Sequence, residues 1–371
     1  VKSYAIQKNK SLEFDNLSKK NKDNQISLVK MQALFFPLMI LLIGISNILV
    51  IYVGGKQYLS GEIENIGIIA EFIIYVNMLT WPVASLGWIS SIIQQAEASQ
   101  KRINEFLKEK SEINYNLNGL KKINGSIEFK DVSFTYTESN IKAIDNISFK
   151  LNNRKSLGII GVTGSGKTTL IKLITKIYNI ESGEILFDNN SINEYDLECL
   201  RKQIGVVSQD SFLFSDSIIN NIRFGKEKAT MNEVENVCKI AGIHNEIIKF
   251  SNGYETILGE RGINLSGGQK QRICIARALI KEPKVLILDD CLSALDNETE
   301  EKIILSLKSI LKNTTTIISS HRLSSVQNLN EIIVLDKGKI IQKGNHELLI
   351  NQNGYYKDVY SKQLTKKDDK I

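Results

Sequence analysis

Residues Gly161 to Thr169 read Gly-Val-Thr-Gly-Ser-Gly-Lys-Thr-Thr and fit the pattern of a phosphate-binding loop at every specified position. The apolar run Ser156 to Ile160 before the loop is short enough for a buried strand, and Leu170 to Ile177 after it has the apolar spacing of a helix. A loop between a strand and a helix directs backbone N–H groups, and the positive end of the helix, at a phosphate. The sequence therefore predicts a nucleoside triphosphate site.

The residue types of this loop suit that chemistry. Its glycines allow backbone conformations and close approaches that a Cβ atom would block, while Lys167 supplies a cation for the outer phosphates. Thr168 offers its hydroxyl to a magnesium ion. The predicted nucleotide-binding residues of the loop are Gly161, Gly164, Ser165, Gly166, Lys167, Thr168 and Thr169.

A second anion-binding feature lies at Leu265 to Gln269, which reads Leu-Ser-Gly-Gly-Gln, directly before the helical segment Lys270 to Ile280. Ser266 is a natural N-cap, and the two glycines leave the helix end open to an anion. Because the first loop already cradles phosphates, this second helix end suggests a site that another copy or a partner completes. The segment resembles the signature motif of the ATP-binding cassette (ABC) family. The resemblance makes Ser266, Gly267, Gly268 and Gln269 contacts to nucleotide.

The resemblance extends from about Ile127 to Tyr360 and brings a metal site with it. Val285 to Asp289 reads as a buried parallel strand that ends in a carboxylate, similar to the Walker B strand of the family. Asp289 would then hold Mg²⁺ through water. Gln209 follows the apolar run Ile204 to Val207 and matches the Q-loop glutamine, which is a metal ligand and a contact toward the transport domain. The implied metal ligands are Thr168, Gln209 and Asp289, and the implied cofactors are ATP and Mg²⁺.

Further motifs of the family follow in order. Tyr136 matches the aromatic residue that stacks on adenine, and His321, after Thr316 to Ile318, matches the switch histidine that touches the γ-phosphate. Ser293 to Asp296 resembles the D-loop, in which Asp296 belongs to the nucleotide site. Gly259 to Gly262 resembles the X-loop, which occurs in exporters rather than importers.

The position after the Walker B aspartate departs from the family. Most members have a glutamate there that activates the attacking water, and this chain has Asp290. Aspartate keeps the charge but is one methylene shorter, and general-base catalysis contributes roughly 10² to 10⁴ in rate. The resemblance implies Asp290, His321 and Gln209 as the catalytic residues, in a site that is slow or degenerate. Since the signature motif is intact, a heterodimer with a more active partner half is favoured over a homodimer.

Two apolar stretches predict a membrane hairpin. Ala33 to Val53 is uncharged and long enough to cross the hydrocarbon core, and Ile63 to Ile93 is a second candidate. The loop Gly54 to Glu62 between them is short and nearly neutral, whereas both outer flanks are basic. The positive-inside bias therefore places both ends of the hairpin in the cytoplasm. The basic flanking residues are Lys19, Lys20, Lys22, Lys30, Lys101, Arg102, Lys108 and Lys110.

A pair of buried helices in a soluble protein is the alternative for these stretches, and the length and lack of charge of the first stretch argue against it. Glu71 and Asn77 are expensive in lipid, so they are candidates for a substrate path. Residues 94–110 continue with helical character into the cytoplasm.

These features predict an all-α transmembrane hairpin followed by an α/β P-loop ATP-binding cassette domain. The expected organisation is a partial ABC transmembrane domain at 1–110, a linker at 111–125, an ATP-binding domain at 126–365 and a charged tail at 366–371. Because exporters of the family carry more than two membrane helices ahead of each cassette, we expect the chain to be a fragment or a truncated product.

Composition adds limits on partners. The net charge of +6 is explained by lysines beside the membrane spans, so no nucleic-acid partner is expected. The four cysteines lack Cys-x-x-Cys spacing, which argues against a metal cluster and fits a reducing cytosol. His244 and His346 lie outside every motif and are interpreted as structural.

The sequence as a whole predicts ATP-driven export by an ABC half-transporter in the cell membrane, with its ATPase domain in the cytoplasm. Its expected partners are a second half-transporter, membrane lipid and a transported substrate of unknown class: a lipid, a peptide or an amphipathic drug. Two alternatives are a regulatory half with a degenerate ATP site and a soluble cassette ATPase in repair or translation. The hairpin argues against the soluble cassette ATPase.

Overall fold

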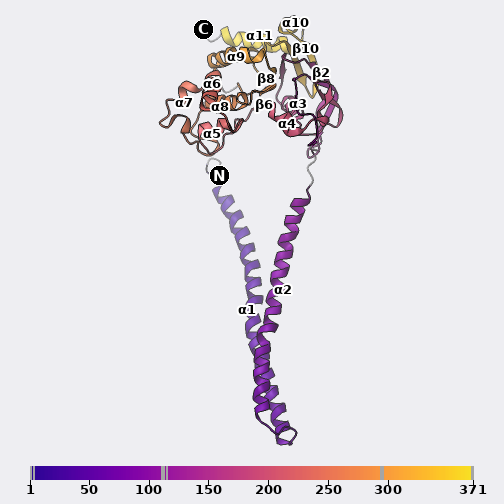
Figure 1. Cartoon of the computed structure of the whole chain (residues 1–371), viewed down its shortest axis with the longest axis vertical. Coiled ribbons are helices and arrows are strands. Elements are labelled where there is room, and N and C mark those ends of the chain that lie inside the picture. Colours follow the sequence, from indigo (N-terminus) through magenta and orange to yellow (C-terminus); the bar gives the residue numbers. More distant parts are fainter. Residues whose placement is uncertain (1, 3–4, 110–112, 114–115, 293–295, 369–371) are drawn as a thin grey trace. The chain divides into compact units, whose positions relative to one another are not determined.

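The computed structural model describes residues 2, 5–109, 113, 116–292 and 296–368, and divides the chain into two compact units, Val1–Lys110 and Ser111–Ile371. Figure 1 shows the first unit as two long helices and the second as a mixed domain of helices and strands. The expected D-loop residues 293–295 lie outside the described residues.

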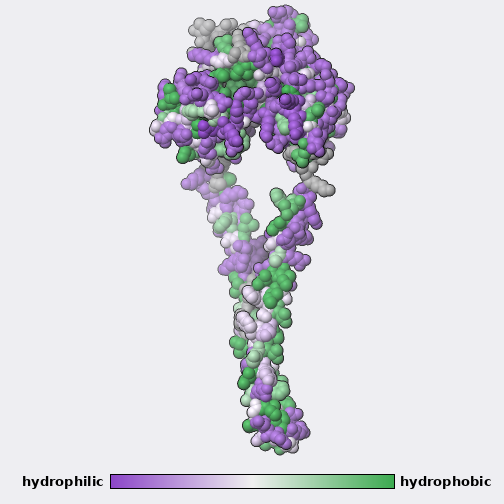
Figure 2. All heavy atoms as spheres, in the orientation of Figure 1, coloured by the Kyte–Doolittle hydropathy of each residue, from purple (hydrophilic) through white to green (hydrophobic). Residues whose placement is uncertain are grey.

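The first unit is a helical hairpin of α1 (Gln7–Leu59, 53 residues) and α2 (Gly67–Lys108, 42 residues). The two helices approach closely at Gly54, where an added Cβ atom would lie 2.9 Å from Cγ1 of Ile69. Both helices are long and apolar enough to cross a membrane over Ala33–Leu59 and Gly67–Lys108. Figure 2 shows hydrophobic side chains along the outer surface of this hairpin, whereas the visible face of the second unit is mostly hydrophilic.

The turn of the hairpin differs from the sequence prediction. Helix α1 continues through most of the expected loop Gly54 to Glu62, and α2 begins only at Gly67. The side chain of Asn65 accepts a hydrogen bond of 2.8 Å from the backbone N–H of Gly67, which satisfies a donor of the first helical turn. Residues 63–66 of the expected second span therefore lie in the turn. From there α2 runs without a break through residues 94–108, as their helical pattern predicted.

The centre of the second unit is a six-stranded sheet with the strand order β10-β9-β3-β8-β7-β6. Its five inner and edge strands β9, β3, β8, β7 and β6 are parallel, and β10 pairs antiparallel with β9. The strands are β3 (Ser156–Gly161), β6 (Ile204–Val207), β7 (Val285–Asp289), β8 (Thr315–Ser319), β9 (Glu331–Asp336) and β10 (Lys339–Gly344).

A smaller antiparallel sheet packs beside it, in the order β2-β1-β4-β5. Its strands are β1 (Ile127–Tyr136), β2 (Ile141–Leu151), β4 (Ser182–Phe187) and β5 (Asn190–Ser191). The second half of the expected linker is fixed to this unit: Leu120 donates from its N–H to the carbonyl of Glu194 at 2.9 Å and accepts from the N–H of Asp196 at 3.0 Å.

Two hydrophobic cores lie on opposite faces of the six-stranded sheet. In β7 the buried side chains alternate, with Leu286 and Leu288 in one core and Val285 and Ile287 in the other. This alternation follows from the period of two along a strand and explains why Val285 to Leu288 are all apolar. The first core is covered by α5 to α11, and the second by α3, α4 and the small sheet.

The helices of the second unit are mostly short. The α-helices are α3 (Lys167–Ile174), α4 (Leu197–Lys202), α5 (Ile218–Arg223), α6 (Met231–Ile240), α7 (His244–Ile247), α8 (Gly267–Leu279), α9 (Asn297–Leu311), α10 (His346–Asn351) and α11 (Tyr355–Asp368). The 3₁₀ turns are η1 (Ile192–Glu194), η2 (Gly253–Glu255), η3 (Glu260–Gly262) and η4 (Leu323–Ser325).

This topology gathers the predicted motifs at one edge. The phosphate loop follows β3, Asp290 follows β7, His321 follows β8 and Gln209 follows β6, and these four strands are neighbours and parallel. Since the carboxyl ends of parallel strands meet at the same sheet edge, segments that are far apart in the sequence converge there.

Candidate functional site

The phosphate loop is a tight turn between β3 and α3 that requires glycine at two positions. A Cβ atom on Gly161 would lie 2.3 Å from the carbonyl oxygen of Leu335, and one on Gly166 would lie 2.6 Å from that of Ala143. Gly166 also has a φ of 107°, in the left-handed region. Gly164 has a φ of 80° but faces open space. The loop backbone is therefore fixed by its packing at Gly161 and Gly166.

The side chain of Lys167 folds back over the loop. Its Nζ donates to the carbonyl oxygens of Gly161 at 2.8 Å and Val162 at 3.0 Å, and the residue is 7% exposed. Burial lowers the pKa of Lys167, while the charges of Asp290 and Asp289 act in the opposite direction. A buried cation beside two carboxylates, at the mouth of a phosphate loop, is positioned to bind an anion.

The residues expected to hold magnesium include a buried carboxylate and a hydroxyl that face one cavity. Asp289 is 3% exposed, and one of its oxygens accepts a hydrogen bond from the hydroxyl of Ser319 on the adjacent strand β8. Asp289 and Thr168 both line a cavity of about 710 Å³. Mg²⁺ in nucleotide sites takes one or two protein oxygens and completes its shell with phosphates and water, so this donor set fits the ion.

Asp290 has a strained and buried environment. Its φ is 44°, unusual for a residue with a side chain, and its N–H donates to the carbonyl of Ser319 at 3.0 Å. Burial raises the pKa of the Asp290 carboxyl, while His321 and Lys167 partly oppose that shift. Strain and a raised pKa at one carboxylate are typical of a residue under functional constraint.

His321 and Gln209 lie at the same sheet edge with exposed side chains. His321 follows β8, and its carbonyl accepts a hydrogen bond of 3.0 Å from the side chain of Gln363 on α11. The other end of that amide accepts from the N–H of Leu323 at 3.1 Å. Gln363 therefore clamps the loop that carries His321.

Tyr136 is held by contacts at its ring and at its hydroxyl. The ring packs edge-on against Phe134 at 4.9 Å and against Tyr178 at 5.4 Å, measured between centroids. The hydroxyl lies 3.0 Å from Oγ1 of Thr169 in the first turn of α3. The predicted base-stacking residue is thus coupled directly to the phosphate-loop helix.

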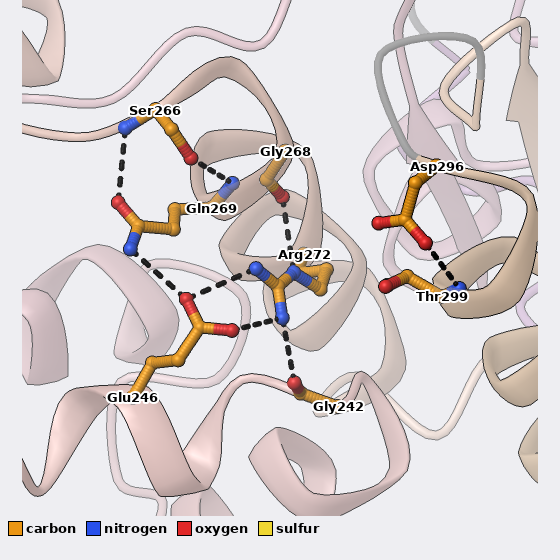
Figure 3. Close-up of polar contacts among 8 residues, drawn as sticks. All are labelled: Gly242, Glu246, Ser266, Gly268, Gln269, Arg272, Asp296 and Thr299. Atoms are coloured by element: carbon orange, nitrogen blue, oxygen red, sulfur yellow. Dashed lines mark hydrogen bonds and ion pairs between the residues drawn. The ribbon is translucent and has the colours of Figure 1, made fainter.

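The signature segment forms the N-terminus of α8 with a reciprocal capping box. The Oγ of Ser266 accepts from the N–H of Gln269 at 3.3 Å, and the Oε1 of Gln269 accepts from the N–H of Ser266 at 2.9 Å. Figure 3 shows these bonds and a further one, from Nε2 of Gln269 to Glu246 at 2.9 Å. The predicted N-cap role of Ser266 is confirmed.

Asp296 directly precedes α9, the helix that follows the expected D-loop. Its carboxylate accepts a hydrogen bond of 2.9 Å from the N–H of Thr299 (Figure 3), and its carbonyl accepts from the N–H of Glu300 at 2.9 Å. This is the geometry of an N-cap, so Asp296 has a structural task in addition to its expected place near nucleotide.

Comparison with known proteins decides the family. A family profile described as "ABC transporter" matches residues 144–293. The "Multidrug resistance-like ATP-binding protein MdlA" of Buchnera aphidicola is 40% identical over 98% of this chain and 62% of its own length. The chain carries the ATP-binding domain of the ABC transporter family. The "Putative multidrug export ATP-binding/permease protein YgaD" of Bacillus subtilis is 36% identical over 98% of the ABC transporter chain and 63% of its own length.

A solved structure titled "Structure of a bacterial Atm1-family ABC exporter with ATP bound" matches the ABC transporter chain with a TM-score of 0.90 and 28% identity. The match covers 98% of this chain and 64% of that one, so this chain spans less than two thirds of these relatives. The matched region includes both units. This confirms the predicted fold class, a helical hairpin followed by an α/β ATP-binding domain, and the membrane location.

Several residues of the ABC transporter site were missed by sequence reasoning. Glu246 accepts a hydrogen bond from Gln269, and Ser319 donates one to Asp289. Tyr178 packs on Tyr136, and Gln363 donates a hydrogen bond to the carbonyl of His321. Each reaches its partner through the tertiary fold. The ring of Tyr178 also contacts Lys172, whose Nζ lies 5.8 Å from the ring centroid.

Proposed function

We propose that the chain is the ATPase-bearing part of an ABC exporter that hydrolyses ATP to drive transport across the cell membrane. The observation that carries this proposal is the convergence of Lys167, Asp289 and Asp290 at the carboxyl edge of the parallel sheet, in a chain with an apolar helical hairpin. The names of the relatives support the direction of transport, since they describe export and multidrug resistance.

ATP would bind with its phosphates in the loop and its base on Tyr136. The loop N–H groups, the N-terminus of α3 and Lys167 bind the phosphate oxygens, and stacking orients the base. Mg²⁺ held by Thr168, Asp289 and Gln209 would neutralise negative charge on the phosphates. His321 would donate to the γ-phosphate from the neighbouring strand end.

Asp290 is the proposed general base for the attacking water. Its raised pKa makes it a better proton acceptor than an ordinary aspartate, because efficient bases have pKa values nearer the working pH. Its side chain is one methylene shorter than the glutamate found in most of the family, which moves the carboxylate away from the water. We expect slow hydrolysis from the combination of these effects.

The signature segment of this chain would complete the nucleotide site of a second half-transporter. The capped N-terminus of α8 presents Ser266, Gly267 and Gly268 with exposed or partly exposed backbone, as an anion site requires. Two cassettes would close head to tail around two ATP molecules. Closure is favoured only because ATP binds the closed dimer better than the open one, and hydrolysis reopens it.

A regulatory half with a degenerate site is the second candidate, and Asp290 favours it. In that case this chain binds ATP, hydrolyses very little and depends on a more active partner, so a heterodimer is preferred to a homodimer. Gln209 would pass the state of the nucleotide to the membrane helices. Glu71 and Asn77 in α2 remain candidates for the substrate path because polar groups are costly in lipid. Within α2, Glu71 accepts a hydrogen bond from the hydroxyl of Tyr75, and Asn77 donates to the carbonyl of Ile73 at 2.8 Å.

The test is the ATPase rate of the full-length protein in lipid, compared with Asp290→Glu and Lys167→Ala. Fast turnover that Lys167→Ala abolishes would support an active homodimeric exporter. Near-silence that glutamate restores by about 10² or more would support the degenerate half. Silence of every variant, with no binding of a fluorescent ATP analogue, would refute the proposed function.

A further inference from the structure

One carboxylate organises the base of the signature helix. Glu246 lies on the short helix α7, and its Oε2 accepts from the Nε2 of Gln269 at 2.9 Å. The same carboxylate accepts two bonds from the guanidinium of Arg272, at 2.5 Å and 3.1 Å. Figure 3 shows Gln269 and Arg272 converging on Glu246 from adjacent turns of α8.

Arg272 ties this carboxylate to the backbone on both sides. Its Nη1 donates to the carbonyl of Gly242 at 2.8 Å, and its Nε donates to the carbonyl of Gly268 at 3.2 Å. The arginine side chain is 11% exposed and that of Glu246 is 37% exposed. Charge-assisted bonds of this kind are shorter and about twice as strong as neutral ones. The network therefore joins α7 to a carbonyl inside the signature segment itself.

The charge of Glu246 decides how the amide of Gln269 is oriented. A carboxylate only accepts hydrogen bonds, so Gln269 must turn its NH₂ group toward Glu246. The amide oxygen then points the other way, where it accepts from the N–H of Ser266 at 2.9 Å. Burial raises the pKa of Glu246, but the bonds from Arg272 and Gln269 outweigh it and leave that pKa lowered, so the carboxylate stays ionised at neutral pH.

We propose that Glu246 is a positioning residue for ATP hydrolysis: it fixes the orientation of Gln269, and through the capping box it holds Ser266 to Gly268 where a nucleotide phosphate is received. This inference rests on the proposed function, because the phosphate belongs to ATP on a partner half. Glu246 itself does not touch nucleotide. Because Glu246 fixes the conformation of the signature segment before the two halves close, less rearrangement of that segment is needed on closure.

The test exchanges the two partners in the full-length protein. Gln269→Glu alone places two carboxylates together, and we expect kcat for ATP to fall at least about tenfold. Glu246→Gln alone removes the charge that orients the amide, with an expected loss of about threefold to tenfold. In the double variant the amide at position 246 donates to the carboxylate at position 269, whose second oxygen still accepts from Ser266. Amide exchange of residues 266–272 should therefore return toward the wild-type rates, whereas turnover should stay low, because position 269 is itself an expected nucleotide contact.

Two readouts separate positioning from a general loss of structure. Binding of a fluorescent ATP analogue to the phosphate loop should stay within about twofold in every variant. Amide exchange of residues 266–272, measured without nucleotide, should rise in both single variants and recover in the double variant. Glu255→Gln, an exposed carboxamide change in η2, is the matched control and should alter neither readout.

The inference is overturned if Glu246→Gln leaves both turnover and exchange unchanged, or if amide exchange in the double variant is no slower than in the worse single variant. Exchange needs no turnover, so it reports on the network independently. A wild type that hydrolyses no ATP would refute the proposed function, while exchange that follows the predicted pattern would still support the role of Glu246 in ordering the signature segment.

Discussion

The hydroxyl of Tyr136 lies 3.0 Å from Oγ1 of Thr169, which joins the end of β1 to the first turn of α3. The ring also packs edge-on against Phe134 and Tyr178, which contact each other. The proposed contact for the base is therefore fixed relative to the proposed contact for the phosphates. Both ends of a bound nucleotide would be positioned by one connected set of side chains.

Replacement of Tyr136 tests this arrangement. Stacking of a base on an aromatic ring contributes about 1–3 kcal/mol, so Tyr136→Ala should weaken ATP binding by roughly 5- to 160-fold. Tyr136→Phe keeps the ring and loses only the bond to Thr169, so affinity should stay within about threefold. Equilibrium binding of a fluorescent ATP analogue measures both. Unchanged affinity in the alanine variant would mean that the base binds elsewhere.

The glycines of the phosphate loop provide a matched pair. Gly166→Ala places a Cβ 2.6 Å from the carbonyl oxygen of Ala143 at a φ of 107°, so the loop must move and ATP binding should fall more than about tenfold. Gly164→Ala also has a positive φ, of 80°, but its Cβ meets open space, and only strain of about 1 kcal/mol is expected. Analogue binding and thermal unfolding measure both variants. Equal losses at the two positions would contradict the packing described for Gly166.

The second unit could be predicted well from sequence where its information is local. Strand β7 has the predicted bounds Val285–Asp289, and β6 those of the predicted run Ile204 to Val207. Strand β7 is buried on both faces, so its apolar run is unbroken up to Asp289, whereas Val206 in the edge strand β6 is exposed and only the apolar run itself marks that strand. Helix α8 begins at Gly267, three residues before the predicted start, because its N-cap Ser266 makes the first turn helical.

The remaining features depend on tertiary contacts that leave no periodic signal. The predicted position of the hairpin turn was wrong. The side chain of Asn65 accepts from the N–H of Gly67, so α2 begins at Gly67, and hydropathy alone does not show this contact. The partners of the motif residues, such as Glu246 for Gln269, are separated by 23 positions and belong to different helices. Motifs identify which residues act, and the fold identifies which residues hold them in place.

The titration of Asp290 should be visible in both activity and stability. Burial raises its pKa in the folded state, so the acid limb of the ATPase profile should lie at higher pH than for an ordinary aspartate of pKa about 3.9. Folding favours the protonated form of Asp290, because its pKa is higher in the folded than in the unfolded protein. The corresponding stability is fully present below the unfolded pKa and is lost as pH rises through the folded pKa.

Asp290→Asn should therefore abolish turnover and yet raise the unfolding temperature at pH 7 relative to the wild type. Thermal unfolding of the nucleotide-free full-length protein at pH 4 and pH 7 gives the comparison. Asp358→Asn, an exposed position on α11, is the control for the change of charge. A lower unfolding temperature for Asp290→Asn at pH 7 would show that its ion pairing outweighs its burial.

Glu300 on α9 is expected to stabilise the loop after His321. Its side chain is 1% exposed and accepts from Nη1 of Arg322 at 2.7 Å, from Ser324 at 3.2 Å and from Ser325. Glu300→Gln replaces one acceptor by a donor that faces these donors, so stability should fall by about 1–3 kcal/mol. Amide exchange over 321–325 should rise as well. Glu301→Gln, exposed on the same helix, should do neither, and equal effects would show that helix charge alone is responsible.

The four cysteines should differ in reactivity because only Cys199 is partly exposed. Burial raises the pKa of Cys238 to about 12, and it also raises the pKa values of Cys274 and Cys291. Since the thiolate is the reactive form, these three should resist a maleimide at pH 7.5, whereas Cys199 should react more slowly than a free thiol. Mass spectrometry of the native and denatured protein counts the labels.

Cys199→Ser should remove native labelling and leave three sites that react only after denaturation. The position of Cys291 makes this test informative about the site, because it directly follows Asp290 and is 1% exposed. Labelling of Cys291 in the native protein would mean that the strand end bearing Asp290 opens on the timescale of the reaction. Protection of Cys291, with or without ATP, would instead show that the strained backbone at Asp290 is held rigidly by the packing between β7 and β8.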